Sequence, residues 1–241
     1  MRRCCLAVLA FLLLPVAAHA EGSLLDQGKT LLQKGGSSGA NLSTGDIASG
    51  LKEALKVGTG RVVDTLGRVD GFAKSKDVHI PLPAALHTVQ GALKKVGMSK
   101  MADDLELRLN RAAEAALPKA KQLFWNAIPA MSLDDARAIY NGPKDAATQY
   151  FRKKMSVPLA NDMRPIVDQS LAQVGAVKSY DQMMARYKSI PLVPDAKADL
   201  TNYTLDKAID ATFLYLGREE AAIRQDPAKQ TTALLRKVFG H

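Results

Sequence analysis

The feature that most constrains the fold is a helical repeat of apolar residues near the middle of the chain, in the stretch 103–140. If residues 103–117 form a helix, five apolar side chains fall at i, i+4, i+7, i+8 and i+11, which is one continuous stripe. They are Leu105, Leu109, Ala112, Ala113 and Ala116. Because most of them are small, neighbouring helices can approach closely. We therefore expect this helix to lie at the centre of a helical domain.

Similar periodicity continues along the rest of the chain. It predicts helices at about 21–34, 43–66, 84–96, 103–117, 132–141, 144–155, 159–174, 179–187, 198–224 and 231–239. Pro118 is expected to end or kink the central helix, because proline has no N–H to donate. No segment alternates apolar and polar residues with a period of two, as strands do. The sequence thus predicts an all-α fold, a compact multi-helix bundle of about eight to ten helices with no sheet, roughly two-thirds helical or more.

Residues 1–20 have the pattern of a secretory signal peptide. Arg2 and Arg3 precede an apolar run at 6–14, and Ala-His-Ala at 18–20 supplies small residues for cleavage. The apolar run is far shorter than the ~20 residues that span a bilayer. We expect cleavage after Ala20, a periplasmic or secreted location, and no transmembrane helix in the processed chain.

The domain boundaries follow from the signal peptide and from a glycine-rich segment after it. We expect residues 21–42 to form a short helix and a Gly/Ser linker, and residues 43–241 to form a single helical domain. The linker sequence GGSSG at 35–39 also matches the G-x-S-x-G pattern of a hydrolase nucleophile elbow. That elbow requires a buried strand before it and a helix directly after it. The preceding residues instead show a polar helical pattern, so we interpret 35–39 as a linker.

The composition excludes several kinds of chemistry. Both cysteines, Cys4 and Cys5, lie in the predicted signal peptide, so the processed chain has no disulfide, thiolate metal site or cysteine nucleophile. The histidines that remain are His79, His87 and His241, and none is spaced with a glutamate as in zinc or di-iron motifs. We therefore predict no cofactor and no metal.

The charge balance is basic. Removal of the signal peptide leaves 31 Lys and Arg residues against 24 Asp and Glu residues, a net charge of +7. This excess favours anionic partners such as envelope lipids or polymers, including peripheral contact with a membrane. We do not expect a nucleic-acid partner, because only the net charge favours one and aromatic residues are few. Surface solubility explains the same excess of basic residues.

One polar cluster lies on the expected central helix. Glu106, Asn110 and Glu114 fall at i, i+4 and i+8, and Arg111 is three residues before Glu114. Such a set forms a buried or cleft-lining network that binds a polar ligand or moves a proton. Alternatively, it is an ordinary solvated helix face with ion pairs, each of which contributes about 0.3–0.5 kcal/mol.

A second polar cluster lies on the expected helix at 198–224. Tyr203, Asp206, Lys207 and Asp210 share the side opposite to its apolar residues. We treat these four residues as a second candidate site.

Several longer motifs carry a family resemblance. They are GLKEALKVGT from Gly50, IPLP from Ile80, DLELRLNRAAEAALPKAK from Asp104, LDDARAIYNGPKDAATQYF from Leu133, RPIV from Arg164 and LLRKVFG from Leu234. In this order they resemble the exported bacterial proteins of domain-of-unknown-function family 4197. The resemblance implies a bacterial cell-envelope protein with a helical domain. It brings no established activity, so it assigns no catalytic residue.

Three functional hypotheses follow. The first is a non-enzymatic envelope protein that binds a protein partner or an anionic lipid or polymer through basic faces. The second is a carrier that holds a small molecule or lipid among its helices near Trp125 and the cluster on the central helix. The third is a hydrolase or lyase in which Glu106 or Glu114 is the general acid or base and Arg111 orients an anionic substrate. The sequence leaves the oligomeric state open.

Overall fold

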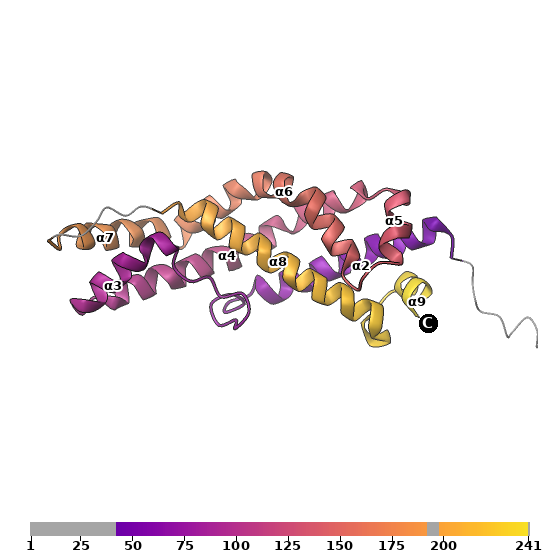
Figure 1. Cartoon of the computed structure of the whole chain (residues 1–241), viewed down its shortest axis with the longest axis horizontal. Coiled ribbons are helices and arrows are strands. Elements are labelled where there is room, and N and C mark those ends of the chain that lie inside the picture. Colours follow the sequence, from indigo (N-terminus) through magenta and orange to yellow (C-terminus); the bar gives the residue numbers. More distant parts are fainter. Residues whose placement is uncertain (1–41, 192–197, 241) are drawn as a thin grey trace, which may run out of the picture. The chain divides into compact units, whose positions relative to one another are not determined.

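The computed structural model describes residues 42–191 and 198–240, and its elements are helices (Figure 1). It is 79% helical and contains eight α-helices and no strand over these residues, so the all-α prediction is confirmed. The α-helices are α2 (Thr44–Leu66), α3 (His87–Lys95), α4 (Ser99–Ala127), α5 (Leu133–Tyr140), α6 (Ala146–Gln173), α7 (Ala176–Lys188), α8 (Leu200–Gln225) and α9 (Ala233–Phe239). Short 3-10 helices follow at Ala84–Leu86, Ile128–Ala130 and Pro227–Lys229. The predicted signal peptide and the predicted helix and linker, apart from Leu42, lie outside the described residues.

Local capping chemistry sets several helix ends where the sequence predicts them. The Ser43 side chain accepts a hydrogen bond from the Asp46 N–H, and the Asp46 carboxylate bonds back, which completes a capping box at the start of α2. The Ser132 side chain caps α5 by accepting a hydrogen bond from the Asp135 N–H. After the end of α6, Gly175 adopts a φ of 74°, a left-handed conformation that favours glycine, and separates α6 from α7.

Pro118 was expected to end or kink the central helix, and the first of these alternatives is wrong. Helix α4 continues through Pro118, and α6 continues through Pro158 and Pro165, which joins two predicted helices into one. A proline removes one hydrogen bond and strains one turn, at a cost of about 3 kcal/mol. Burial of apolar side chains after the proline in α4, such as Phe124, offsets that cost. Tertiary packing therefore overrides the local signal.

Helix α4 is the centre of the packing, as predicted. The five residues of its apolar stripe are fully buried, and α4 packs against α2, α3, α6, α7 and α8. Figure 1 shows α8 running across the middle of the view, with α3 and α7 near one end of it and α5 and α9 near the other. Phe213 of α8 makes edge-on contacts with Phe124 of α4, at 6.3 Å, and Phe151 of α6, at 6.0 Å. These rings join the three longest helices.

The segment 67–83, between α2 and the first 3-10 helix, contains no α-helical residue. It turns through Asp70 and then extends toward Pro83, as the prolines of IPLP predict. Phe72 and Ile80 are nevertheless fully buried. Their backbone groups therefore require hydrogen-bond partners from elsewhere in the molecule.

Of the helices that lie within residues 42–191 and 198–240, none is long and apolar enough to cross a membrane.

Candidate functional site

The first predicted cluster, which we call the α4 stripe (Glu106, Asn110, Arg111 and Glu114), is brought together along α4. Glu114 is buried, and its Oε1 accepts hydrogen bonds from the N–H groups of Phe72 and Ala73, both at 3.0 Å. Its Oε2 accepts from the Arg111 guanidinium at 2.6 Å. Arg111 also donates to Asp70 Oδ1 at 2.6 Å. The carboxylate thus binds the backbone of segment 67–83, and Arg111 neutralises its charge.

The other two members of the stripe bind the same segment further along. Asn110 Oδ1 accepts from the Ile80 N–H at 2.9 Å, and its Nδ2 donates to the Ile80 carbonyl at 2.8 Å. Glu106 Oε1 lies 2.8 Å from His79 Nε2, and its Oε2 accepts from the Leu82 N–H at 3.2 Å. Every polar side chain of the stripe therefore has a partner from segment 67–83.

Asp70 is the half-buried end of this network, and its φ of 70° is unusual for a residue with a side chain. Hydrogen bonds from Lys74 and Arg111 hold the pKa of the Asp70 carboxyl below its usual value of 3.8. Hydrogen bonds to Glu114 and Asp70 raise the pKa of Arg111. Both shifts favour the charged forms of Asp70 and Arg111.

The structure divides the second predicted cluster into two pairs. The Tyr203 hydroxyl donates to the Pro81 carbonyl at 3.0 Å, and Lys207 lies 5.7 Å from the centre of the Tyr203 ring. Burial, and to a smaller extent the charge of Glu106, raise the pKa of the Tyr203 hydroxyl. Tyr203 therefore joins the α4 stripe in holding segment 67–83.

Asp206 and Asp210 are exposed and border a surface hollow of about 520 Å3 between α6 and α8. Arg152 and Arg164 of α6 line the same hollow, and Arg152 pairs with Asp210. Its charges are balanced, two arginines against two aspartates.

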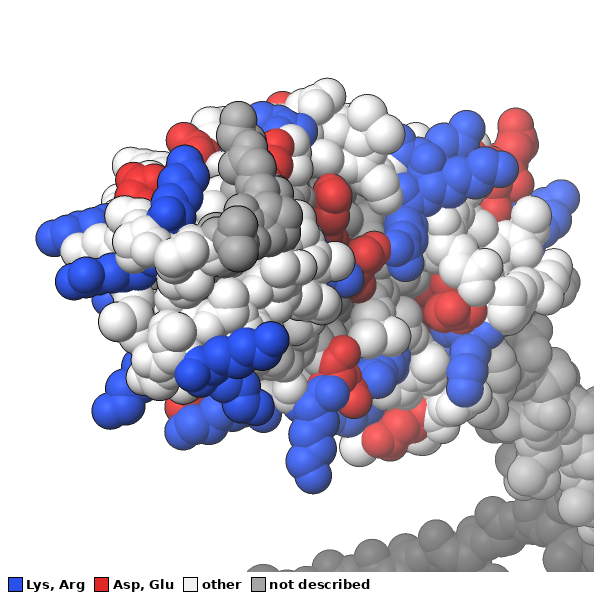
Figure 2. All heavy atoms as spheres, turned by 60° about the vertical axis from the view of Figure 1, so that its left-hand side comes forward, with Lys and Arg blue, Asp and Glu red and all other residues white. Residues whose placement is uncertain are grey.

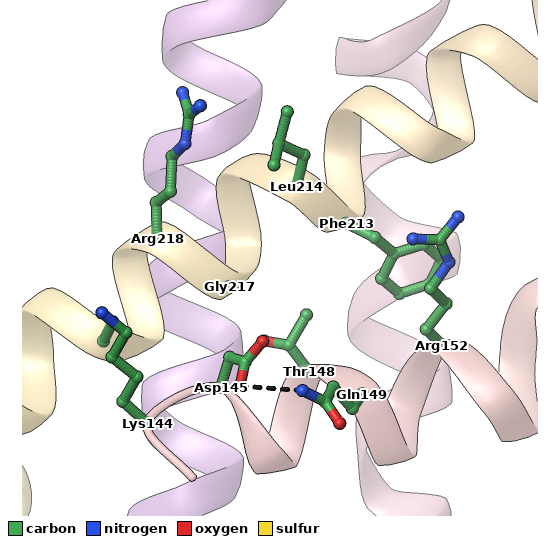
Figure 3. A pocket seen from close by; sticks show the side chains of 10 residues that line it. Lys144, Asp145, Thr148, Gln149, Arg152, Phe213, Leu214, Gly217 and Arg218 are labelled. Carbon is green, nitrogen blue, oxygen red and sulfur yellow. Dashed lines mark hydrogen bonds between the residues drawn. The ribbon is translucent and has the colours of Figure 1, made fainter.

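A second hollow, of about 330 Å3, shares Arg152 with the first (Figure 3). We call it the α6–α8 groove. It is lined by Lys144, Asp145, Thr148, Gln149 and Arg152 at the start of α6, and by Phe213, Leu214, Gly217, Arg218 and Ala221 of α8. Gly217 leaves the groove open because it has no side chain. A Cβ atom built there would lie 3.5 Å from the Asp145 Cβ, in ordinary contact.

The lining of the α6–α8 groove carries three cations and one carboxylate. The Arg152 guanidinium lies 5.7 Å from the centre of the Phe213 ring. Arg218 pairs with Asp77 at 2.6 Å, which raises the Arg218 pKa. Lys144 makes no ion pair or hydrogen bond with any described residue. Arg152 also pairs with Asp210, so Lys144 is the one lining cation that has no carboxylate partner among the described residues.

Within the groove, the Asp145 carboxylate already accepts a hydrogen bond from Gln149. Its Oδ1 accepts a hydrogen bond from Gln149 Nε2 at 2.9 Å, drawn in Figure 3. The bond fixes the side chain between Lys144 and Arg152, so it separates the two cations of this wall.

Glu220, which the sequence analysis missed, fixes the first turn of α6 against α8. The side chain is buried and accepts from the N–H groups of Ala147, at 3.0 Å, and Thr148, at 2.7 Å. It also accepts from the Thr148 hydroxyl at 2.7 Å and pairs with Arg224 at 2.9 Å. Glu220 lies four residues after buried Leu216 on α8, and therefore on the apolar side of that helix. A carboxylate at such a position indicates a buried polar contact.

Lys144, Gly217 and Arg218 also lie outside the two predicted clusters. Gly217 carried a weak signal, since a glycine inside a helical pattern destabilises the helix and commonly has a packing or functional reason. Lys144 and Arg218 carried no such signal. Each is an ordinary basic residue in the sequence, and only the packing of α6 against α8 brings both into one groove.

Charged side chains are otherwise mixed on the surface. Figure 2 shows Lys and Arg in small groups between Asp and Glu on the face that it presents. Across the residues that the structure describes, no group of three or more His, Cys, Asp and Glu side chains is arranged to hold a metal ion.

The comparison with sequence families supports the resemblance noted above. The model of the family described as "Protein of unknown function (DUF4197)" matches residues 41–240, and the chain belongs to this family. No curated protein and no solved structure matches the chain.

Proposed function

We propose that this member of the family is an exported cell-envelope protein that binds a small anionic molecule in the α6–α8 groove without converting it. The observation that carries the proposal is a lining that brings three cations, Lys144, Arg152 and Arg218, beside the apolar side chains of Phe213 and Leu214. A carboxylate or phosphate group of the ligand would contact the cations, and an apolar part would contact Phe213 and Leu214. Export rests on the signal-peptide pattern of residues 1–20.

Binding is favoured over catalysis by the state of the candidate acids and bases. A general base must reach the proton that it removes. Both oxygens of Glu106 and both oxygens of Glu114 are already bonded within the molecule. The hydrolase or lyase hypothesis therefore has no free base in the α4 stripe. In the groove, the Thr148 hydroxyl is bonded to Glu220, which leaves Thr148 with a structural role.

A groove ligand is also favoured over a long polyanion. A polyanion gains affinity from many cations along one continuous face, whereas the face drawn in Figure 2 has cations interspersed with carboxylates. The carrier hypothesis placed its ligand beside the α4 stripe, where Asn110 and Glu114 are buried against segment 67–83. The proposal places the ligand between α6 and α8 instead.

Native mass spectrometry of the processed protein, purified gently from the periplasm of a bacterial host, tests the proposal. We expect a non-protein mass that is lost when the same sample is denatured. Gly217→Leu should abolish this adduct by filling the groove. Its thermal stability should not fall, because replacing a glycine inside a helix favours the helix by up to about 1 kcal/mol.

Gly91→Leu is the matched control. Gly91 lies inside α3, and a Cβ atom there would meet nothing within 4 Å. We expect this variant to keep the adduct. An unmodified protein without any adduct, or an adduct that survives Gly217→Leu, would contradict the proposal.

A further inference from the structure

The only tryptophan of the chain, Trp125, lies at the surface of α4 under lysines from two helices. Lys121 Nζ, from α4, is 4.8 Å from the centre of the indole ring, and Lys56 Nζ, from α2, is 5.2 Å from it. The two ammonium groups are therefore no more than 10.0 Å apart. The indole Nε1 donates to the Lys56 carbonyl at 3.3 Å, which fixes the ring against α2.

These two lysines lack carboxylate partners. Neither Lys56 nor Lys121 forms an ion pair with a described residue. The sequence from Ala115 to Leu133 contains no Asp or Glu, and Glu53 is the one carboxylate in the adjacent part of α2. A third lysine, Lys52, precedes Lys56 by four residues on α2 and so lies on the same side of that helix.

Lys52 extends the cationic surface toward the end of α4. Its Nζ donates to the Pro129 carbonyl at 3.1 Å, and Pro129 is exposed in the 3-10 helix that follows α4. We call the set Lys52, Lys56, Lys121, Trp125 and Pro129 the Trp125 patch. It combines three cations with an aromatic ring and a proline.

We propose that the Trp125 patch docks the protein on a lipid surface that carries anionic phospholipid headgroups. Tryptophan is favoured at the boundary between water and hydrocarbon, because its ring is apolar and its N–H is polar. Lysines beside such a ring extend to the phosphates while their methylene groups cover apolar surface. Each lysine close to an anionic membrane strengthens binding by about fivefold. The patch therefore matches the chemistry of an anionic headgroup layer.

This surface is separate from the α6–α8 groove. The patch belongs to α2, α4 and the turn after α4, whereas the groove belongs to α6 and α8. Failure of one binding surface therefore leaves the other intact, and the two are tested with different probes.

Fluorescence of Trp125 tests docking directly, because no other tryptophan contributes. The unmodified processed protein is titrated with vesicles of phosphatidylglycerol and phosphatidylcholine in equal parts. We expect a blue shift, quenching by brominated acyl chains, and loss of both effects at high salt. An equal response to pure phosphatidylcholine vesicles or to inorganic phosphate alone, or no response, would overturn the proposal.

Paired charge variants locate the surface. Lys56→Gln with Lys121→Gln should weaken flotation with the same vesicles by about 25-fold. Lys94→Gln with Lys95→Gln removes the same charge from exposed positions of α3 and should leave flotation unchanged. Flotation is the readout here, because the first pair also changes the surroundings of the fluorophore. Equal losses in both pairs would show attraction by net charge alone and would overturn the assignment to the patch.

Discussion

The two polar clusters differ in what lies opposite them. Both place two carboxylates on one side of a long helix with basic neighbours, eight residues apart on α4 and four residues apart on α8. The α4 stripe faces segment 67–83, so its polar atoms bind backbone N–H and C=O groups and become buried. On α8, Asp206 and Asp210 face solvent and border the hollow of about 520 Å3 that adjoins the α6–α8 groove. A polar pattern on one helix thus does not determine burial, which depends on the segment that packs across it.

The difference has an energetic basis. A segment without helical hydrogen bonds can be buried only if side chains satisfy its backbone. The α4 stripe performs this role for segment 67–83, and Glu220 performs it for the first turn of α6. We therefore expect substitutions in the stripe to reduce stability and substitutions among the exposed α8 residues to have little effect.

Glu114→Ala should have the largest effect. The change leaves the N–H groups of Phe72 and Ala73 without their acceptor and leaves Arg111 without one of its two carboxylates. We expect a loss of about 3–5 kcal/mol in the free energy of unfolding, measured by urea denaturation. Asp206→Ala, on exposed α8 surface, is the comparison and should change it by less than about 0.5 kcal/mol. Similar losses in the two variants would remove the distinction between the clusters.

Asn110→Ala should come next. It removes both hydrogen bonds to Ile80, whose backbone is buried. We expect a loss of about 2–3 kcal/mol by the same denaturation measurement. Asn126→Ala, an exposed asparagine on the same helix, should cost less than about 0.5 kcal/mol. If Asn110→Ala costs no more than this control, segment 67–83 does not depend on the stripe.

Asp70→Asn should alter the response to acid. The Asp70 pKa is lower in the folded protein than its usual 3.8, so its ion pairs stabilise the fold above that value. The contribution disappears as pH falls through the folded-state pKa. Asp70→Asn should therefore be less stable than the unmodified protein at pH 7, and the difference should be smaller at an acidic pH below 3.8. A difference of the same size at both pH values would contradict this account.

Asp210→Ala should have the smallest effect. Its pair with Arg152 is exposed on both sides, with 50% and 57% of the two side chains accessible. Exposed pairs contribute about 0–1 kcal/mol, so the midpoint in urea should scarcely move. The variant should also strengthen ligand binding in the α6–α8 groove, because it frees Arg152. A large loss of stability would show that Asp210 has a structural role like that of the α4 stripe, and would contradict this prediction.

The sequence predicts features whose causes are local. The capping serines Ser43 and Ser132 define helix starts because their partners are three residues away. The apolar stripe of α4 and the extended IPLP segment follow from periodicity and from proline in the same way. Pro118 misleads because packing from other helices decides whether the helix continues.

The site follows from contacts that are distant in sequence. The sequence groups the members of the α4 stripe correctly, but the partners of Glu114 lie 41 and 42 residues away. The α6–α8 groove is formed by residues of two helices. No pattern in the sequence relates Lys144 to Arg218, because only the packing of the helices brings them to the same groove. Glu220 was the detectable exception, since a carboxylate among core positions requires a buried partner.

Amide hydrogen exchange, followed by NMR at Phe72, Ala73, Ile80 and Leu82, tests the central claim most directly. These four N–H groups belong to a segment without helices and donate to the α4 stripe. We predict protection close to that of core helix amides, with exchange only through global unfolding. Exchange at the rates of an exposed loop would contradict the claim that the stripe is structural, and would return Glu106 and Glu114 to the set of residues free to act on a ligand.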